Sequence, residues 1–232
     1  ARDEEIWLKR FRRLVNEELF ATYASVMTGA VKPVDAEAYL TMLAEEAVRA
    51  QLRFVANRRD LPVQSILNNI NIIAMGKLGM GRMAPLSDLD LIVVNSDPDT
   101  LPDLRAFMSR FITGMTAKMS EGIAYDLDLR LRPNGRSGPP AIPLASFENH
   151  HQKSAKTWEH LALTAGRVLA LGQDTQAVQG LEASRRRILC APRELEQARL
   201  DAARMLVRLR KHRIRDNAAS GTEVFAQHRF NI

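Results

Sequence analysis

Two aspartates two residues apart follow a glycine-rich turn in this chain. Asp88 and Asp90 lie in the run Ser87-Asp88-Leu89-Asp90, shortly after Gly76-Lys77-Leu78-Gly79. Apolar residues before the glycines and after Asp90 predict two strands, and residues i and i+2 of a strand point to the same face. We therefore expect the two carboxylates to project side by side. Adjacent anions repel each other, and hard oxygen ligands suit Mg²⁺, so these acids are candidate metal ligands.

A third candidate ligand lies in a later segment where polar and apolar residues alternate strictly. From Ile123 to Arg132 the alternation predicts a half-buried strand with Asp126 and Asp128 on its polar face. Three acids from two strands could hold two Mg²⁺ ions about 3.5–4 Å apart, an arrangement that serves phosphoryl transfer. For Asp126 two interpretations stay open: a further metal ligand, or an ion-pair partner of Arg130 or Arg132. The candidate catalytic and metal-binding residues are Asp88, Asp90 and Asp128.

The glycine turn predicts a phosphate site. Because Gly76 and Gly79 lack side chains, backbone N–H groups there could approach a polyphosphate closely. Lys77 either neutralises phosphate or lies in solvent, and Ser87 either bonds a phosphate or caps the turn. The two arginines after Asp128 either clamp a triphosphate bidentately or pair with the acids. The candidate nucleotide-binding residues are Gly76, Lys77, Gly79, Ser87, Arg130 and Arg132.

Three blocks, in this order, resemble the glutamine synthetase adenylyltransferase family. The blocks are Gly76–Gly79 with Ser87–Ile92, then Gly122–Pro133, then Thr157–Leu163. A glycine turn, an Asp-x-Asp strand and a later aspartate also resemble the wider nucleotidyltransferase superfamily that includes polymerase beta. The resemblance covers the chain from the helices before Gly76 to about Val168.

The resemblance implies a reaction, a cofactor and a partner. The reaction is transfer of AMP from ATP to a tyrosine hydroxyl of glutamine synthetase, with release of pyrophosphate, which regulates nitrogen assimilation. ATP is then the substrate, two Mg²⁺ ions are the cofactors with Mn²⁺ as an alternative, and glutamine synthetase is the protein partner. A nitrogen-signalling regulatory protein is a further candidate partner.

The family's full-length enzymes have two catalytic halves, and the blocks around Asp128 and Thr157–His160 are similar to the C-terminal, AMP-attaching half. The alternative is the deadenylylating half, which removes AMP from glutamine synthetase as ADP by phosphorolysis. A second alternative is a nucleotide-sensing or nucleic-acid-binding module without catalysis. The three intact acids argue against that module, since a pure binder needs no such cluster.

The chain also departs from the family pattern. Arg82 stands where the family has an acid, so the role of that acid cannot be transferred to this chain. A later block of the family has only a weak echo in Thr222–Phe225. Because the sequence starts with Ala1 and ends soon after this echo, we expect a fragment of a longer polypeptide.

Composition sets broad limits. The 232 residues are 46% hydrophobic, with a formal net charge of +6 and a single cysteine, Cys190. No apolar run approaches the roughly 18 residues of a membrane span, and Cys190 alone fits a reducing cytoplasm. The excess positive charge gathers at 185–187 and 204–215 without interleaved aromatic residues, so we expect a solvated helix face and no nucleic-acid partner.

The hydrophobic pattern predicts an α+β fold: a polymerase beta-like nucleotidyltransferase with a small mixed sheet, flanked by N-terminal helices and a C-terminal helical bundle. The expected domains are an N-terminal helical segment at 1–66, a catalytic core at 67–145 and a truncated helical bundle at 146–232. Predicted details include a loop at 57–69, a helix starting at Phe147 with Ser146 as cap, and one helix over 156–171. We further expect surface positions for His150 and His151 and a core position for Trp158.

Overall fold

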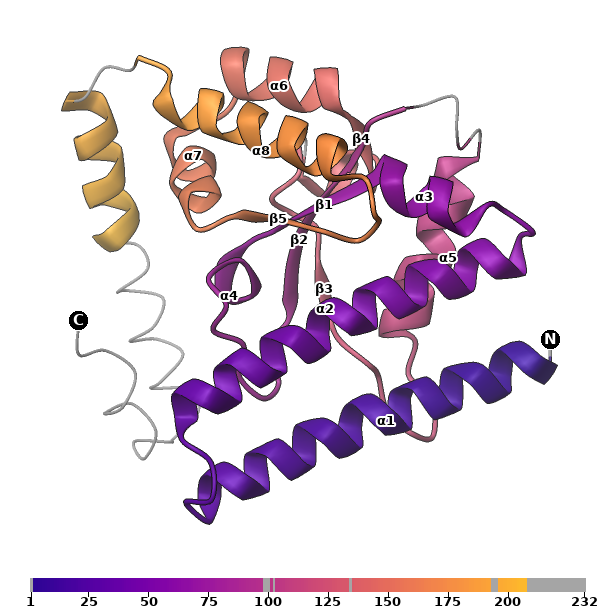
Figure 1. The fold of residues 1–232 in the computed structure, drawn as a ribbon. Helices are drawn as coiled ribbons and strands as arrows, with labels where there is room; N and C mark the ends of the chain where they lie inside the picture. Colours follow the sequence, from indigo (N-terminus) through magenta and orange to yellow (C-terminus); the bar gives the residue numbers. More distant parts are fainter. Residues whose placement is uncertain (1, 98–100, 102, 134, 193–195, 208–232) are drawn as a thin grey trace.

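The computed structural model describes residues 2–97, 101, 103–133, 135–192 and 196–207 (Figure 1). The helices are α1 (Arg2–Met27), α2 (Pro33–Arg58), α3 (Val63–Asn69), α4 (Gly76–Gly79), α5 (Leu104–Thr116), α6 (Leu144–Lys153), α7 (Thr157–Thr164) and α8 (Thr175–Cys190), followed by a helical stretch at 196–207. The strands are β1 (Ile70–Ala74), β2 (Leu89–Asn95), β3 (Leu127–Asp128), β4 (Ile142–Pro143) and β5 (Arg167–Leu169), and a short 3-10 turn spans Gly135–Ser137.

The sheet is mixed, and β2 is central to it. The strand order is β3-β2-β1-β5, and β4 pairs with the far end of β2. β1 runs antiparallel to both β2 and β5, whereas β3 and β4 run parallel to β2. The predicted α+β class with a small mixed sheet is therefore confirmed.

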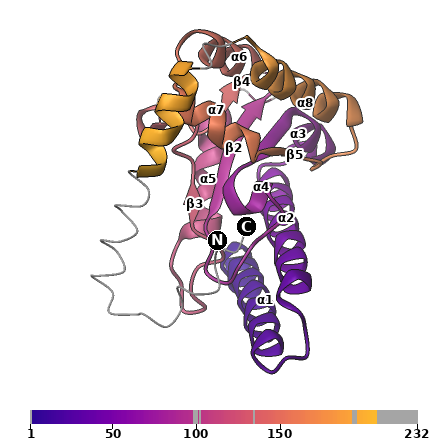
Figure 2. The same cartoon turned by 90° about the vertical axis from the view of Figure 1, so that its left-hand side faces the viewer.

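Helices cover both faces of the sheet. The hairpin of α1 and α2 lies on one side together with α5, and α6, α7 and α8 lie on the other, as both views show (Figure 1, Figure 2). Alternate residues of β1 and β2 divide between two cores: Ile72 and Val93 belong to the α1–α2–α5 cluster, and Ile73 and Ile92 to the α6–α8 cluster. Buried on both faces, β1 and β2 form a rigid platform for whatever lies at their ends.

Two predicted elements are wrong because tertiary contacts override local pattern. The loop expected at 57–69 contains α3, which begins after Pro62 and buries Ile66 and Leu67. The single helix expected over 156–171 ends at Thr164, and β5 follows it. This segment becomes a strand because the free edge of β1 has hydrogen-bonding groups that β5 satisfies.

Two further boundaries also differ from the expectation. The strand predicted from Ile123 to Arg132 has ladder pairing only at Leu127–Asp128. The expected burial of Tyr125 and Leu129 is found, but Ala124, expected on the polar face, is buried as well. Helix α6 begins at Leu144 after Pro143, so Ser146 lies inside the helix instead of capping it. Proline fixes the backbone torsion before the first turn, which moves the helix start.

The predicted division into three domains stays a prediction. The strand β5 lies in the segment 146–232, and it joins the sheet of the segment 67–145. The weak echo at Thr222–Phe225 and most of the basic stretch at 204–215 lie outside the described residues. None of the helices in the described part of the chain is both long and apolar enough to cross a membrane.

Candidate active site

The carboxylates of Asp88, Asp90 and Asp128 meet at one end of the sheet. Each offers an oxygen, and the three oxygens lie within 4.8 Å of one another. Asp90 and Asp128 are register partners on the parallel strands β2 and β3, and Asp88 immediately precedes β2. Leu89 between the two acids is buried on the opposite face, as the i, i+2 rule predicts. The structure therefore brings together the three acids that the spacing singles out.

The cluster is electrostatically unfavourable for the ionised acids. Burial, together with the charges of Asp88 and Asp128, raises the pKa of Asp90 to about 6. Arg130 and Lys77 oppose this rise without cancelling it. Three hard oxygen donors that disfavour one another's charge fit a divalent cation such as Mg²⁺ or Mn²⁺. The donor set is thus the right kind for the metal that the sequence predicts.

Asp126 is exposed and, among the described residues, is not a member of this group of acids. Its carbonyl oxygen accepts a hydrogen bond from Leu89 N–H at 2.9 Å, which ties the start of β3 to β2. Asp126 does line an open cavity of about 640 Å³ that Asp88 and Asp128 also line. The structure therefore gives its backbone a positioning contact at the cluster.

The two candidate arginines differ in their contacts. Arg130 donates from Nε to both carboxylate oxygens of Asp128, at 2.9 and 2.7 Å, and from its backbone N–H at 2.8 Å. Of the two alternatives for Arg130, a triphosphate clamp or an ion pair with the acids, the structure shows the ion pair, and the side chain is exposed. Arg132 instead donates to the carbonyls of Leu129 and Gly138, the latter at 3.0 Å, although it also lines the cavity.

The glycine turn is the helical turn α4, and it lies against the acid cluster. Gly76 has a positive φ of 53°, and a Cβ built there would stand 2.2 Å from Asp90 Oδ2. The backbone N–H of Met75 donates to the carbonyl of Asp90 at 2.8 Å. A side chain at position 76 would collide with the acid, so glycine is required there for steric and torsional reasons.

Ser87 closes the loop between the glycine turn and the acids. Its hydroxyl accepts from Ala84 N–H at 3.2 Å and from Lys77 Nζ at 3.1 Å. Ser87 therefore caps the turn in this structure. The contact also directs the exposed Lys77 side chain toward the segment that carries Asp88.

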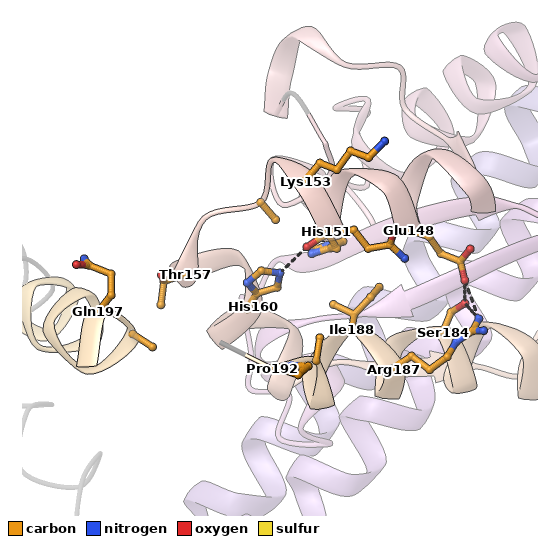
Figure 3. Close-up of a pocket in the computed structure, with 14 residues that line it drawn as sticks. Glu148, His151, Lys153, Thr157, His160, Ser184, Arg187, Ile188, Pro192 and Gln197 are labelled. Carbon is orange, nitrogen blue, oxygen red and sulfur yellow. Dashed lines mark hydrogen bonds and ion pairs between the residues drawn. The ribbon is translucent and has the colours of Figure 1, made fainter. Parts of the chain in front are cut away.

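A second cavity, of about 520 Å³, lies between α6, α7, α8 and the helical stretch at 196–207 (Figure 3). His160 shares a hydrogen bond with the carbonyl of His151 at 3.1 Å. His151 is buried, so its predicted surface position is wrong, whereas His150 is partly buried and contacts Glu159 at 2.6 Å. Trp158 is 40% exposed and is not a core residue.

Sequence reasoning missed one pair of side chains near the glycine turn. Arg167 of β5 donates to the carbonyl of Leu78 at 3.2 Å and forms an ion pair with Glu45 of α2. The pair joins segments 122 residues apart, so no local pattern reports it. The sequence does show polar residues at every fourth position of α2, and this repeat includes Glu45. It does not indicate that Arg167 is the partner.

Comparison with known proteins identifies the family of this chain. The family described as glutamate-ammonia ligase adenylyltransferase matches residues 1–183. Curated relatives named bifunctional glutamine synthetase adenylyltransferase/adenylyl-removing enzyme include those of Xanthobacter autotrophicus, 40% identical over 183 residues (72% of this chain, 18% of the relative), and Mesorhizobium japonicum, 30% identical over 223 residues (90% of this chain, 22% of the relative). The chain thus spans about a fifth of the length of these relatives. By the extent of the match, the chain belongs to the glutamate-ammonia ligase adenylyltransferase family.

Proposed function

We propose that this chain transfers AMP from ATP to a tyrosine hydroxyl of glutamine synthetase and releases pyrophosphate. The observation that carries the proposal is the acid cluster Asp88, Asp90 and Asp128, with three carboxylate oxygens within 4.8 Å beside a glycine turn. A phosphoryl site needs this combination, because cations must be held next to backbone donors for the phosphates. The names of the curated relatives support glutamine synthetase as the protein substrate.

In this proposal the acid cluster holds two divalent cations, Mg²⁺ or Mn²⁺. When bound, the cations would lower the pKa of the attacking hydroxyl and offset charge on the leaving pyrophosphate. The chain's own groups bind and orient the nucleotide. The backbone N–H of Gly76 and the ammonium of Lys77 would bind phosphate oxygens, and Ser87 would hold Lys77 in place. The N–H of Gly79 already donates to the carbonyl of Met75 at 2.9 Å, so Gly79 would serve the close packing of the turn and not phosphate binding.

Arg130 and Arg132 would bind the triphosphate from the opposite side of the cavity. Arg130 is exposed, so its guanidinium can turn from Asp128 to phosphate oxygens without breaking core packing. Arg132 is anchored to the carbonyl of Gly138, and in this position it borders the cavity. Two guanidinium groups suit a triphosphate better than two lysine ammonium groups would, because a guanidinium can donate two parallel hydrogen bonds to phosphate oxygens.

The proposed direction is attachment of AMP. What supports it is the resemblance of the segments Tyr125–Arg132 and Thr157–Leu163 to the attaching half of the family. The printed names of the relatives include both activities, and a chain of about a fifth of their length can carry one of them. We infer a cytoplasmic location because the single cysteine fits a reducing compartment, and a nitrogen-signalling protein as a regulatory partner.

The test is a labelling assay with this chain, Mg²⁺, α-labelled ATP and unmodified glutamine synthetase. We expect label on glutamine synthetase, and none when Asp90→Asn replaces the wild type. In a parallel reaction, phosphate and adenylylated glutamine synthetase should yield no ADP. Release of ADP without labelling would assign the chain to the removing half, and neither product from a folded, Mg·ATP-binding chain would support the nucleotide-sensing alternative.

A further inference from the structure

Helix α2 carries four polar residues at every fourth position on the side that approaches the glycine turn. They are Glu37, Thr41, Glu45 and Arg49, here called the polar stripe. Residues four apart on a helix lie on one face, so the stripe forms a continuous line along α2. Thr41 is only 6% exposed, and Leu40 and Ala44 beside it are buried. Polar groups in such a position require partners, and each member of the stripe has one.

The first two members reach the loop that follows the glycine turn. Glu37 lies 3.4 Å from Arg82, and the hydroxyl of Thr41 accepts from Met83 N–H at 3.2 Å. The stripe therefore holds the loop after the turn at two consecutive residues.

The third contact reaches the turn itself through Arg167. Glu45 binds the guanidinium of Arg167, and the same nitrogen donates to the carbonyl of Leu78 at 3.2 Å. Arg167 is fixed in turn by its register pairing with Ala74 at the end of β1. Arg49 completes the line by donating to the carbonyls after β5, at 2.7 Å to Ala170 and 3.2 Å to Leu171.

Close packing prevents the turn from moving away from these contacts. A Cβ built at Gly79 would stand 2.2 Å from the carbonyl oxygen of Ala165 and 2.5 Å from that of Ala74. The backbone of Gly79 therefore already touches the end of β1 and the residue after α7. With Leu78 held by Arg167 on a further side, the turn has little freedom to tilt.

We propose that the polar stripe of α2, acting through Arg167, positions the glycine turn for the nucleotide triphosphate. The inference rests on the proposed function and deepens it: Glu45, Thr41 and Arg167 are positioning residues, and they do not touch the substrate. Leu78 lies in the same short turn as Gly76 and Lys77, so a contact that holds its carbonyl limits how far these two residues can shift from the phosphates. A phosphate-binding group that moves from its position loses charge-assisted hydrogen bonds to the triphosphate, so loss of this support should weaken binding.

The test compares Mg·ATP affinity, measured by calorimetry, with thermal stability in Arg167→Gln and Glu45→Gln. We expect the dissociation constant for Mg·ATP, and with it the KM for ATP, to rise on the order of tenfold while kcat changes less. The KM for glutamine synthetase should stay as in the wild type. Arg167→Lys should restore part of the affinity, because a lysine can keep the Glu45 contact or the Leu78 contact.

The matched control is Glu182→Gln in α8. Like Glu45, this acid forms an ion pair with arginine, in its case with Arg185 and Arg186. Its Mg·ATP affinity should equal that of the wild type. If Arg167→Gln lowers the melting temperature but the folded variant binds Mg·ATP like the wild type, the contact is structural only and the proposal is wrong. Should that variant fail to fold, Thr41→Val removes the hydroxyl that accepts from Met83 N–H and donates to the carbonyl of Glu37, and unchanged affinity in it would overturn the proposal equally.

The two proposals fail in distinguishable ways. A wild-type chain that binds Mg·ATP but transfers no AMP contradicts the proposed function, while weaker binding in Glu45→Gln would still support the positioning role. Normal transfer and normal affinity in both Arg167→Gln and Glu45→Gln would contradict the positioning role alone.

Discussion

The carboxylates of the acid cluster and those of helices α6–α8 differ in the partners that the fold gives them. At the end of β2, three aspartates stand within 4.8 Å of one another. In the helical group, Glu148 contacts Arg187 at 2.8 Å, Glu159 contacts His150 at 2.6 Å, and Glu182 contacts Arg185 at 2.7 Å. Each helical acid has its own basic side chain as a partner, whereas the three aspartates lie against one another, with Arg130 on Asp128 and Lys77 nearby.

The pKa values of Asp90 and Glu182 are shifted in opposite directions, as expected from this difference in partners. Burial and like charges raise the pKa of Asp90 to about 6, whereas a hydrogen bond from Arg185 lowers the pKa of Glu182. Folding therefore stabilises the anion at Glu182 and destabilises it at Asp90. A group that the fold keeps in a costly state is a candidate for function, and matched pairs are more simply structural. By this criterion the cavity of Figure 3, although similar in size, is the weaker candidate site.

The largest expected effect is on transfer in Asp90→Asn. The change removes one charge with almost no change in volume, so the loss of a metal ligand should reduce AMP transfer by about 1000-fold, or roughly 4 kcal/mol. Without added metal the variant should be at least as stable as the wild type at pH 7, because a repelled charge is gone. Rates of labelled transfer and melting temperatures measure the two quantities, and wild-type transfer would remove the acid cluster from the mechanism.

Next in size is the contrast between two glycines. Gly79→Ala places a methyl group where two carbonyl oxygens already lie, and should lower the free energy of unfolding by about 1–3 kcal/mol. Gly180→Ala, in α8, has nothing within 4 Å of the new Cβ and should raise that free energy by up to about 1 kcal/mol. Chemical denaturation of both variants measures the difference, and equal effects would show that the turn is not closely packed.

A smaller effect is expected from Mg²⁺ on thermal stability. At about ten times its dissociation constant, Mg²⁺ should stabilise the wild type by about 1.4 kcal/mol at pH 7.5. The folded pKa of Asp90 lies above the usual carboxylate value, so the metal-free fold takes up a proton there below about pH 6, and this proton competes with the cation. Stabilisation by Mg²⁺ should therefore shrink as pH falls through 6, and persistence at pH 5 would argue against Asp90 as a ligand.

The smallest expected effect is in Glu182→Gln. The folded pKa of Glu182 is lowered, so its contribution to stability is present above the unfolded pKa and disappears as pH falls through the folded one. Solvent screening limits this contribution to about 0.5 kcal/mol. Denaturation at pH 7 and at pH 3 should show the loss only at the higher pH, with AMP transfer unchanged. A large loss of transfer would mean that this ion pair is not merely structural.

Sequence alone determined the parts of the site that local periodicity encodes. The i, i+2 spacing of Asp88 and Asp90 placed both on one face of β2, since strand side chains alternate strictly. Alternation before and after Asp128 located the third acid, and the glycines located the turn. These features depend on a few adjacent residues, so they can be read without knowledge of the fold.

The tertiary structure decided what depends on partners distant in the chain. The segment Arg167–Leu169 forms β5 because the edge of β1 was free to pair with it. The two arginines have different partners, since Arg130 donates to Asp128 and Arg132 donates to the carbonyl of Gly138. The contact of Glu45 with Arg167 spans 122 residues, and no periodicity in either segment specifies it. Packing brings such groups together only after the sheet and the helices have met, so the support of the glycine turn could be recognised only in the folded chain.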